Sequence, residues 1–382
     1  MRVLQFVQKP QRRGAEIFAF QLSGALRRLG HEVSTIYLYP YDGDTPLDVL
    51  PGDRVLQGAE RSRLEVTLGH NPALLREVCD AIDDSKPDIV QVNGARTVKY
   101  GALARRRRSG APWRLVYRNI DNPAYWATDP IRRWFYRRRI FPWIEGTVGV
   151  SQATLDEVVR MYGLTTPTVF VPNGFDPEPL DAAPAMEEAR ERLGVSLDRP
   201  LMLFMGNLTE QKRPDRFLRV FARVKADLPT AEAWMLGSGP LADELKQQAR
   251  ELSLADSIRF LGYQKDVAPY IAACDVLVVT SDSDGIPAVV LESAYLGKPA
   301  VVTRVGGLHE CVVEGETGFL VDPRDEEGLA GRVKTVLNDD EVRRGLGDEA
   351  RRYAVDNFTI EAVGKRYLEF YERVIDQART GR

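Results

Sequence analysis

"VLVVTSDSDGIPAVVLESAYLGKPAVVTRV", residues 276–305, contains two short apolar β-branched runs on either side of a longer segment of helical composition. We expect the first run to be a buried strand and "SDSDG" a loop. The next segment predicts a helix with Pro287 in its first turn, where proline is tolerated, and Gly297 at its end. A second strand then begins at "PAVV". A strand, a helix and a second strand in this order predict a parallel sheet covered by helices.

The same alternation of strands and helices extends through the chain, and it starts again with a second first strand at residue 200. Expected strands lie at 2–8, 33–39, 87–94, 114–120, 146–151 and 168–174, and then at 200–207, 231–239, 258–263, 276–281, 299–305 and 318–321. The sequence therefore predicts two doubly wound α/β domains, residues 1–176 and 177–357, with a hinge in the segment 173–194, which is rich in Pro and Ala. The segment 358–382 predicts an amphipathic helix. Ligands of such sheets bind at the carboxyl ends of the strands, so we expect a site in a cleft between the domains.

The composition is that of a globular protein of two ordinary domains, with 382 residues, 44% hydrophobic and 28% charged. Three widely spaced cysteines argue against a disulfide scaffold and for a reducing compartment. The amino-terminal sequence does not look like a secretory signal, and no apolar run is long enough to span a membrane. We therefore expect a cytoplasmic protein. No His, Cys and carboxylate cluster has the spacing of a zinc site.

The net charge of −3 conceals an uneven distribution. Residues 1–176 carry 25 Lys and Arg against 19 Asp and Glu, whereas the remainder carries 27 against 36. The positive charge of the first half suggests that this half of the chain contacts an anionic partner. The isoelectric point near 5.9 argues against a nucleic-acid partner.

Two glycine-containing loops follow expected first strands. In "QRRGAE" (11–16), Gly14 opens a turn and the next helix offers amides to an anion, with Arg12 and Arg13 beside it. In "GNLTEQKRP" (206–214), Lys212 and Arg213 could stabilise the charge of a diphosphate leaving group. The alternative for each loop is an ordinary strand-to-helix turn with solvated cations.

The loop at 280–287 offers a third anion site, where Ile286 to Val289 would present free amides. Asp284 precedes the expected helix and Glu292 lies on it, so both carboxylates could line one sugar nucleotide. The alternatives are a helix cap for Asp284 and a solvated position for Glu292.

The D-x-D pair Asp282–Asp284 also suggests a divalent metal, but a lone pair of this kind is a weak signal. "GSGP" (237–240) lacks the third glycine of a dinucleotide fingerprint, which argues against NAD.

Taken together, these motifs resemble those of the family 4 retaining glycosyltransferases of the GT-B fold, the glycosyl transferases of group 1. The most specific element is a carboxylate, seven residues and Glu292, followed by "LGKPAVVTRVGGLHE" (296–310) and "EGETGFLV" (314–321). "VPNGFD" (171–176) and "GNLTEQKRP" match in the same order, and "RGAE" (13–16) and "DIVQVNG" (88–94) match more loosely.

The resemblance implies a fold of two Rossmann-like domains facing a cleft, with the carboxyl-terminal helix packing back on the first. It also implies that the second domain holds most of a nucleotide diphosphate sugar. Glu292 would accept from the ribose hydroxyls and Asp284 from the sugar hydroxyls. The remaining donor residues would be Gly285 and Ile286 with their amides, Gly206, Asn207 and Lys212 at the diphosphate, Tyr263 and Gln264 at the base, and Gly14 from the first domain. The residues expected to carry catalysis are Asp284, Lys212 and Arg213.

The chain also departs from the family pattern. Asn207 stands where many members have Arg, a contact that Arg213 would replace, and Arg13 stands where a second glycine is usual. Gln91 and Asn93, and then Asn119 or Ile120, occupy places where members often have His. The acceptor-side residues would then be Arg13, Asn93, Asn119 and Asp121.

The reaction implied is transfer of a hexose-type sugar, with retention, from a UDP- or GDP-linked donor to a hydroxyl on a saccharide, lipid-linked or small-molecule acceptor. Because no carboxylate nucleophile can be named, we expect a front-face reaction in which the leaving phosphate takes the acceptor proton. No metal or other cofactor is required in this scheme. The alternatives are a non-catalytic nucleotide-sugar-binding protein and a sugar-nucleotide epimerase of the same fold.

The segment "DPIRRWFYRRRIFPWIEG" (129–146) has five arginines and five aromatic residues, and a second basic cluster lies at 105–108. One interpretation is a peripheral contact with an anionic membrane, at the inner membrane face. The other is a helix whose aromatic residues pack in the core while its arginines are solvated.

Overall fold

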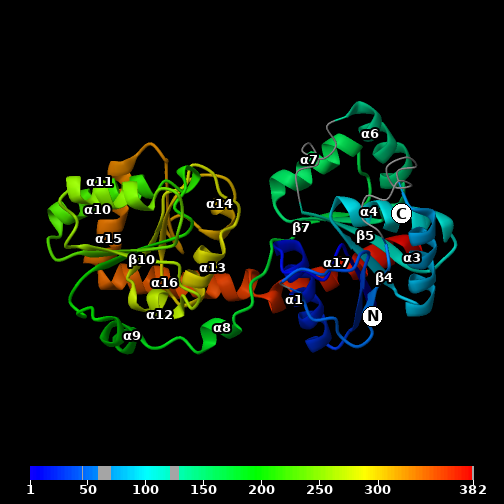
Figure 1. Cartoon of the computed structure of the whole chain (residues 1–382), viewed down its shortest axis with the longest axis horizontal. Coiled ribbons are helices and arrows are strands. Elements are labelled where there is room, and N and C mark those ends of the chain that lie inside the picture. The colour runs from blue at the N-terminus through cyan, green and yellow to red at the C-terminus, as the bar shows by residue number, and fades with distance from the viewer. Residues whose placement is uncertain (45, 59–69, 121–128, 381–382) are drawn as a thin grey trace. The chain divides into compact units, whose positions relative to one another are not determined.

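The computed structural model describes residues 1–44, 46–58, 70–120 and 129–380. The chain forms two compact units, Met1–Gly174 with Ile360–Arg382, and Phe175–Thr359. Each is an α/β unit with its own parallel sheet, as the sequence predicts (Figure 1).

The first unit contains a sheet of seven parallel strands in the order β3-β2-β1-β4-β5-β6-β7. The strands are β1 (Arg2–Val7), β2 (Glu32–Tyr37), β3 (Arg54–Val55), β4 (Ile89–Asn93), β5 (Arg114–Asn119), β6 (Gly146–Gly149) and β7 (Thr168–Phe170). The helices are α1 (Gly14–Arg28), α3 (Pro72–Ser85), α4 (Ala95–Arg107), α6 (Pro130–Phe135), α7 (Gln152–Tyr162) and α17 (Ile360–Thr380), with short helical turns at Tyr136–Ile140 and Phe141–Trp143. The two-residue strand β3 and helix α3 were not expected from the sequence.

Two apolar layers cover this sheet, one on each face. Residues of α3, α4, α7 and the turns after α6 pack with Leu4, Phe6 and their neighbours on one face. On the other face, α1 and α17 pack against Val3, Ile89 and Val116. Figure 1 shows α17, in red, beside α1, in blue. The carboxyl-terminal helix is therefore an integral part of the first unit.

The second unit has six parallel strands in the order β10-β9-β8-β11-β12-β13. These are β8 (Leu201–Met205), β9 (Glu232–Leu236), β10 (Ile258–Gly262), β11 (Val276–Val279), β12 (Ala300–Thr303) and β13 (Gly318–Val321). The helices are α8 (Glu178–Asp181), α9 (Met186–Leu193), α10 (Pro214–Asp227), α11 (Ala242–Glu251), α12 (Ala268–Ala273), α13 (Ala288–Tyr295), α14 (Leu308–Cys311), α15 (Glu326–Asn338) and α16 (Asp340–Asn357). Helices α10, α11 and α15 cover one face, and α9, α12 and α13 cover the other.

Much of the segment that was expected to be a hinge, 173–194, is packed structure in the second unit. Helix α9 ends in this segment, and its Arg190 is buried. The guanidinium donates to Asp275 at 2.8 Å and to the carbonyl oxygens of Ala273, Ser196, Leu197 and Arg199. The hinge prediction is wrong for this part, because a buried, fully bonded arginine fixes the helix to the sheet.

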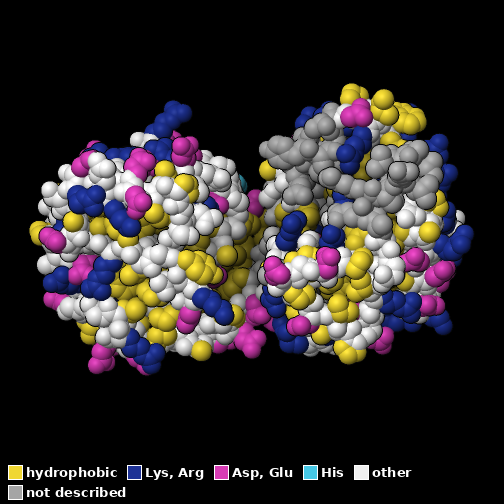
Figure 2. All heavy atoms as spheres, viewed as in Figure 1, with side chains coloured by type: hydrophobic (Ala, Val, Ile, Leu, Met, Phe, Trp, Pro, Cys, Tyr) yellow, Lys and Arg dark blue, Asp and Glu magenta, His cyan; other side chains and the backbone are white. Residues whose placement is uncertain are grey.

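Basic and acidic side chains are interspersed over both units on the face drawn in Figure 2. Among the residues that the structure describes, no helix combines the length and apolarity needed to cross a bilayer.

Candidate functional site

The centre of the second sheet lies between β8 and β11, which are neighbours although β9 and β10 separate them in the sequence. After β8 the chain passes to α10 on one face of the sheet, and after β11 it passes to α13 on the other. The two loops therefore diverge at the carboxyl edge and leave a place where a ligand can approach backbone groups. These loops, 206–213 and 280–287, carry most of the residues expected to bind the donor.

Lys212 and Asp284 come together across these two loops. Nζ of Lys212 lies 2.6 Å from Oδ2 of Asp284, which also accepts from Ser281 Oγ at 3.0 Å. The side chains are 25% and 9% exposed, respectively, so the pair is partly desolvated but reachable from solvent. Helix α13 begins at Ala288, and its first turn does not use Asp284 as a cap. The capping alternative for Asp284 is therefore excluded.

A second set of ionic contacts ties the same loops together. Arg213 donates to Asp215 and to Asp282, and Arg216 donates to Asp282 at 2.7 Å and to the carbonyl oxygen of Thr280 at 2.6 Å. Although partial burial acts in the opposite direction, hydrogen bonds from Arg213 and Arg216 lower the pKa of Asp282. The guanidinium of Arg213, which was expected to replace a phosphate contact, is instead held by two carboxylates.

Backbone bonds and hydroxyl groups reinforce this connection. Thr280 Oγ1 donates to the carbonyl oxygen of Arg213 at 2.8 Å, and the amide of Asp282 donates to the carbonyl oxygen of Gln211 at 2.9 Å. Arg213 itself has φ of +50°, a left-handed conformation that is costly for a residue with a side chain. These contacts hold the loop in that conformation and thereby fix Lys212, the preceding residue.

Gly306 fits closely against the loop that carries Asp284. It has φ of +51°, and a Cβ atom there would lie 1.8 Å from the carbonyl oxygen of Asp284. The amide of Gly307 donates to that same oxygen at 3.0 Å. Glycine is thus required on both conformational and steric grounds, which explains why the "VTRVGG" motif accompanies the two carboxylates.

Glu292 is half-buried on α13, one helical turn after its start. Burial raises the pKa of its carboxyl group, and burial is the sole cause of this shift. Within the described residues, no hydrogen bond or ion pair joins the Glu292 side chain to another group. A desolvated carboxylate without a protein partner can accept hydrogen bonds from a ligand's hydroxyl groups. The alternative of a fully solvated helix position is therefore wrong.

The other expected donor residues lie around the same carboxyl edge. Gly206 directly follows β8, and a Cβ atom on Gly237 would lie 1.8 Å from its carbonyl oxygen. Asn207 and Gly285 are exposed, and Ile286 is partly exposed. Tyr263 follows β10 and is 74% exposed, whereas Gln264 donates to the carbonyl oxygen of Leu261 at 2.8 Å.

In the first unit, the expected donor residue Gly14 and the expected acceptor-side residues have mixed environments. Gly14 is the first residue of α1 with open space where its Cβ would be, and Arg13 before it is exposed. Asn93 is buried and donates to Gln5 Oε1 and to the carbonyl oxygen of Phe6, both at 3.0 Å.

Asn119 is fully buried. It accepts from Tyr117 and donates to the carbonyl oxygen of Thr154, each at 2.9 Å, so its side chain stabilises the fold and cannot contact an acceptor in this arrangement. Asp121 lies outside the described residues.

The D-x-D pair has cationic partners. Asp282 contacts Arg213 and Arg216, and Asp284 contacts Lys212. In the part of the chain that the structure describes, no three His, Cys, Asp or Glu side chains gather as they would around a metal ion.

Two family models match the chain in adjoining regions. Residues 12–179 match the model described as Glycosyltransferase Family 4, and residues 185–353 match Glycosyl transferases group 1. The chain belongs to the group 1, family 4 glycosyltransferases. The site residues of the second unit all lie within the region matched by the group 1 model.

Several curated relatives of this family member are glycosyltransferases by name. It is 28% identical over 197 residues to N-acetyl-alpha-D-glucosaminyl L-malate synthase of Bacillus anthracis, covering 52% of this chain and 51% of that one. It is 33% identical over 180 residues to the lipopolysaccharide core biosynthesis glycosyltransferase LpsE of Rhizobium meliloti, covering 47% and 52%. The chain thus spans about half the length of these two relatives. A third, GDP-mannose-dependent alpha-(1-6)-phosphatidylinositol monomannoside mannosyltransferase of Mycolicibacterium smegmatis, is 26% identical, with 94% of this chain and 95% of that one covered.

Solved structures confirm the GT-B fold of this family member. HepE of Anabaena in complex with UDP has a TM-score of 0.74 and 22% identity, with 97% of this chain and 99% of that chain covered. WaaG, a glycosyltransferase involved in lipopolysaccharide biosynthesis, has a TM-score of 0.61 and 17% identity, with 96% and 98% covered.

Arg216 and Gly306 both shape the site of this family member, but its sequence does not directly reveal a role for either residue. The sequence pattern places Arg216 on a helix and Gly306 within a motif, and neither pattern assigns a contact. The signal for Gly306 is the motif itself, since a double glycine after a strand favours a close backbone approach. Arg216 has no such signal, because its partner Asp282 is 66 positions away.

Proposed function

We propose that this protein is a retaining glycosyltransferase that moves a hexose-type sugar from a UDP- or GDP-linked donor to a hydroxyl acceptor. The observation that carries this proposal is the Lys212–Asp284 pair at the switch point of the second sheet, followed by Glu292 on α13, whose carboxylate has no partner among the described residues. A cation, a partly exposed loop and two carboxylates suit the diphosphate and the hydroxyl groups of a nucleotide sugar. The relatives named above support the reaction class.

In this proposal, the donor diphosphate replaces Asp284 as the main partner of Lys212. The carboxylate of Asp284 is then free to accept hydrogen bonds from sugar hydroxyls, and the amides of Gly285 and Ile286 face the phosphates or the sugar. Glu292 accepts from the two ribose hydroxyls, which satisfies its half-buried oxygens. Tyr263 offers its exposed ring to the base, beside Gln264.

The proposed chemistry is a front-face displacement. As the bond between the anomeric carbon and the leaving oxygen breaks, negative charge accumulates on the diphosphate, where Lys212 and the loop amides stabilise it. The acceptor hydroxyl attacks from the same face and transfers its proton to a leaving phosphate oxygen. The protein contributes positioning and charge, and needs no carboxylate nucleophile, no metal ion and no other cofactor. The acceptor is a saccharide, a lipid-linked molecule or a small molecule, with Arg13 on the acceptor side.

A donor screen tests this proposal directly. The melting temperature is measured with UDP-, GDP- and ADP-linked hexoses, and sugar release is followed with and without a chelator. We expect one class of nucleotide sugar to stabilise the protein, with slow donor hydrolysis that the chelator does not change. If no nucleotide sugar shifts the melting temperature, the donor assignment fails. If a donor binds but neither hydrolysis nor transfer to any acceptor occurs, a binding protein without turnover replaces the enzyme.

A further inference from the structure

The basic-aromatic segment of the first unit, residues 130–144, consists of α6 and the two helical turns after it. Part of it belongs to the core, because Tyr136, Ile140 and Phe141 are buried and Phe141 stacks on Tyr162 with ring centroids 3.9 Å apart. Ile144 is buried as well, and Phe135 and Trp143 are half-buried, whereas the five arginines, Ile131 and Trp134 are exposed. Ile131 and Trp134, three residues apart on α6, are 76% and 57% exposed. Residues three apart lie on one side of a helix, so α6 presents a small apolar surface to solvent.

Within the described residues, three arginines of this segment have no ionic partner, whereas Arg105 and Arg108 of the second basic cluster do. Residues 130–144 contain five arginines and no Asp or Glu. Arg137, Arg138 and Arg139 are exposed and form no ion pair within the described residues. In the cluster at 105–108, by comparison, Arg105 pairs with Glu145 and Arg108 with Asp83. The second cluster therefore supports the fold, whereas the first leaves positive charge available for another molecule.

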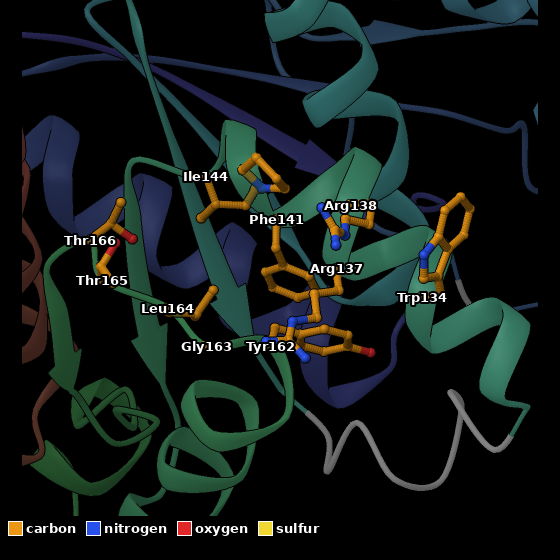
Figure 3. A pocket seen from close by; sticks show the side chains of 11 residues that line it. Trp134, Arg137, Arg138, Phe141, Ile144, Tyr162, Gly163, Leu164, Thr165 and Thr166 are labelled. Atoms are coloured by element: carbon orange, nitrogen blue, oxygen red, sulfur yellow. The ribbon is translucent and has the colours of Figure 1, made fainter.

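Two adjoining hollows surround Trp134 and Arg137. The first has a volume of about 650 Å³ and is lined by these two residues together with Arg138, Phe141, Ile144 and Tyr162. The second has about 610 Å³ and includes Arg133 and Arg160, together with Glu157, which pairs with Arg160. Figure 3 shows the guanidinium groups of Arg137 and Arg138 beside the rings of Phe141 and Tyr162, with Trp134 further along the same wall. The surface thus combines a concave basic floor with an apolar edge.

We propose that this surface docks on an anionic phospholipid bilayer. Ile131 and Trp134 enter the interfacial layer, where an indole ring is favoured, and Arg137 and Arg138 contact lipid phosphates above the larger hollow. An anionic bilayer has negatively charged headgroups on its outside and hydrocarbon beneath them. The arginines suit the headgroups, and the exposed apolar side chains suit the layer beneath. A nucleic acid would use the arginines but not the exposed Ile131. The inference goes beyond the proposed function and does not depend on it.

Flotation with lipid vesicles tests the inference. The full chain is incubated at physiological salt with vesicles of equal parts phosphatidylcholine and phosphatidylglycerol, and separately with pure phosphatidylcholine vesicles. We expect it to float with the anionic vesicles and not with the neutral ones. Each arginine near an anionic surface contributes about a fivefold gain in affinity, so Arg137→Ala/Arg138→Ala should bind ~30-fold more weakly. Ile131→Ser/Trp134→Ala should also bind more weakly.

A matched control removes the same charge from the opposite face of the sheet. Arg373 and Arg379 are exposed on α17, which packs on the face away from α6, and the double variant Arg373→Ala/Arg379→Ala should bind as the wild type does. Far-ultraviolet circular dichroism and the melting temperature of each variant without ligand verify that every variant is folded. Lack of flotation with anionic vesicles would overturn the inference, as would equal losses in the test and control pairs. Unchanged binding of the Ile131/Trp134 variant would contradict docking through this surface.

Discussion

Nζ of Lys212 lies 2.6 Å from Oδ2 of Asp284, although 72 positions separate the two residues in the chain. The pair exists because β8 and β11 are neighbours in the sheet and their loops leave its carboxyl edge side by side. A lysine held by a partly buried carboxylate is already positioned, so the proposed binding of a donor diphosphate would require less ordering of this side chain.

Replacing Lys212 by Met should lower the transfer rate by about 100- to 1,000-fold, because loss of one preorganised donor to a developing charge costs ~3 kcal/mol. Lys212→Arg keeps the charge with a different shape and should retain a larger part of the activity. Initial rates at saturating donor measure both. The idea fails if Lys212→Met transfers sugar at the wild-type rate while its melting temperature remains normal.

Asp284→Asn should separate nucleotide binding from transfer. The substitution removes the competing carboxylate but leaves Lys212 positive, so free UDP or GDP should raise the melting temperature at least as much as in the wild type. Transfer should be lost, since the sugar hydroxyls lose a charged acceptor. Titration with the nucleoside diphosphate and a transfer assay give the two results. A variant that loses the nucleotide shift would show that Asp284 acts on the diphosphate side.

Glu292→Gln should abolish the donor-induced melting shift and yet stabilise the protein at neutral pH. Burial raises the pKa of Glu292, so the folded chain binds its proton more readily than the unfolded chain. The stability contributed by this residue therefore falls as pH rises through the raised pKa. Because glutamine does not titrate, the melting temperature of the variant should exceed that of the wild type by an amount that grows from about pH 4 to pH 7.

Scanning calorimetry across this pH range measures the effect of the Glu292 substitution. Glu187→Gln, at an exposed position of α9, serves as the control and should follow the wild type. A difference between Glu292→Gln and the wild type that stays constant, or shrinks, as pH rises would contradict a raised pKa for Glu292.

Arg216 should act as a positioning residue for the donor loops. Arg216→Met breaks its contacts with Asp282 and Thr280, which join the two loops, so the loop that carries Lys212 loses a restraint. We expect the donor KM to rise about tenfold or more, with a smaller change in kcat, and Arg216→Lys to restore part of the loss. A merely structural role would lower the melting temperature without changing the KM of the remaining folded enzyme.

Gly306→Ala should damage the site by a purely backbone effect. The new Cβ would collide with the carbonyl oxygen of Asp284, and φ of +51° is itself unfavourable for alanine, so we expect a loss of stability of about 1–3 kcal/mol together with loss of donor binding. Gly331→Ala provides the matched control. Gly331 lies inside α15 with open space around its Cβ position, so alanine there should stabilise by about 0.5–1 kcal/mol. Chemical denaturation of both variants compares these effects.

The order of strands and helices, and the position of the expected donor residues of the second unit near strand ends, could be predicted because periodicity and turn residues are local signals. The partners of Arg213 and Arg216 could not, since they depend on which strands become neighbours in the sheet. The prediction for Asn119 was wrong for a different reason. A parallel sheet is covered on both faces, so alternation along β5 does not reveal whether a polar side chain lies inside the core.

The division between the two units, at Gly174 and Phe175, lies in the segment 173–194 expected to be a hinge. The prediction was wrong for the part that forms α9, because proline and alanine suggest a flexible connection. The buried contacts that fix Arg190 of α9 come from residues up to 85 positions away and leave no local trace.

Helix α17 belongs to the first unit but is translated after the second unit, which affects how the first unit folds during synthesis. It supplies Ile360, Val363, Tyr367, Phe370, Tyr371 and Val374 to one apolar layer of a sheet whose strands all precede Gly174. At about 5–20 residues per second, a ribosome needs roughly ten to forty seconds to translate the intervening second unit. During that interval the nascent first unit exposes the apolar surface that α17 later covers beside α1, which is a natural binding surface for a chaperone.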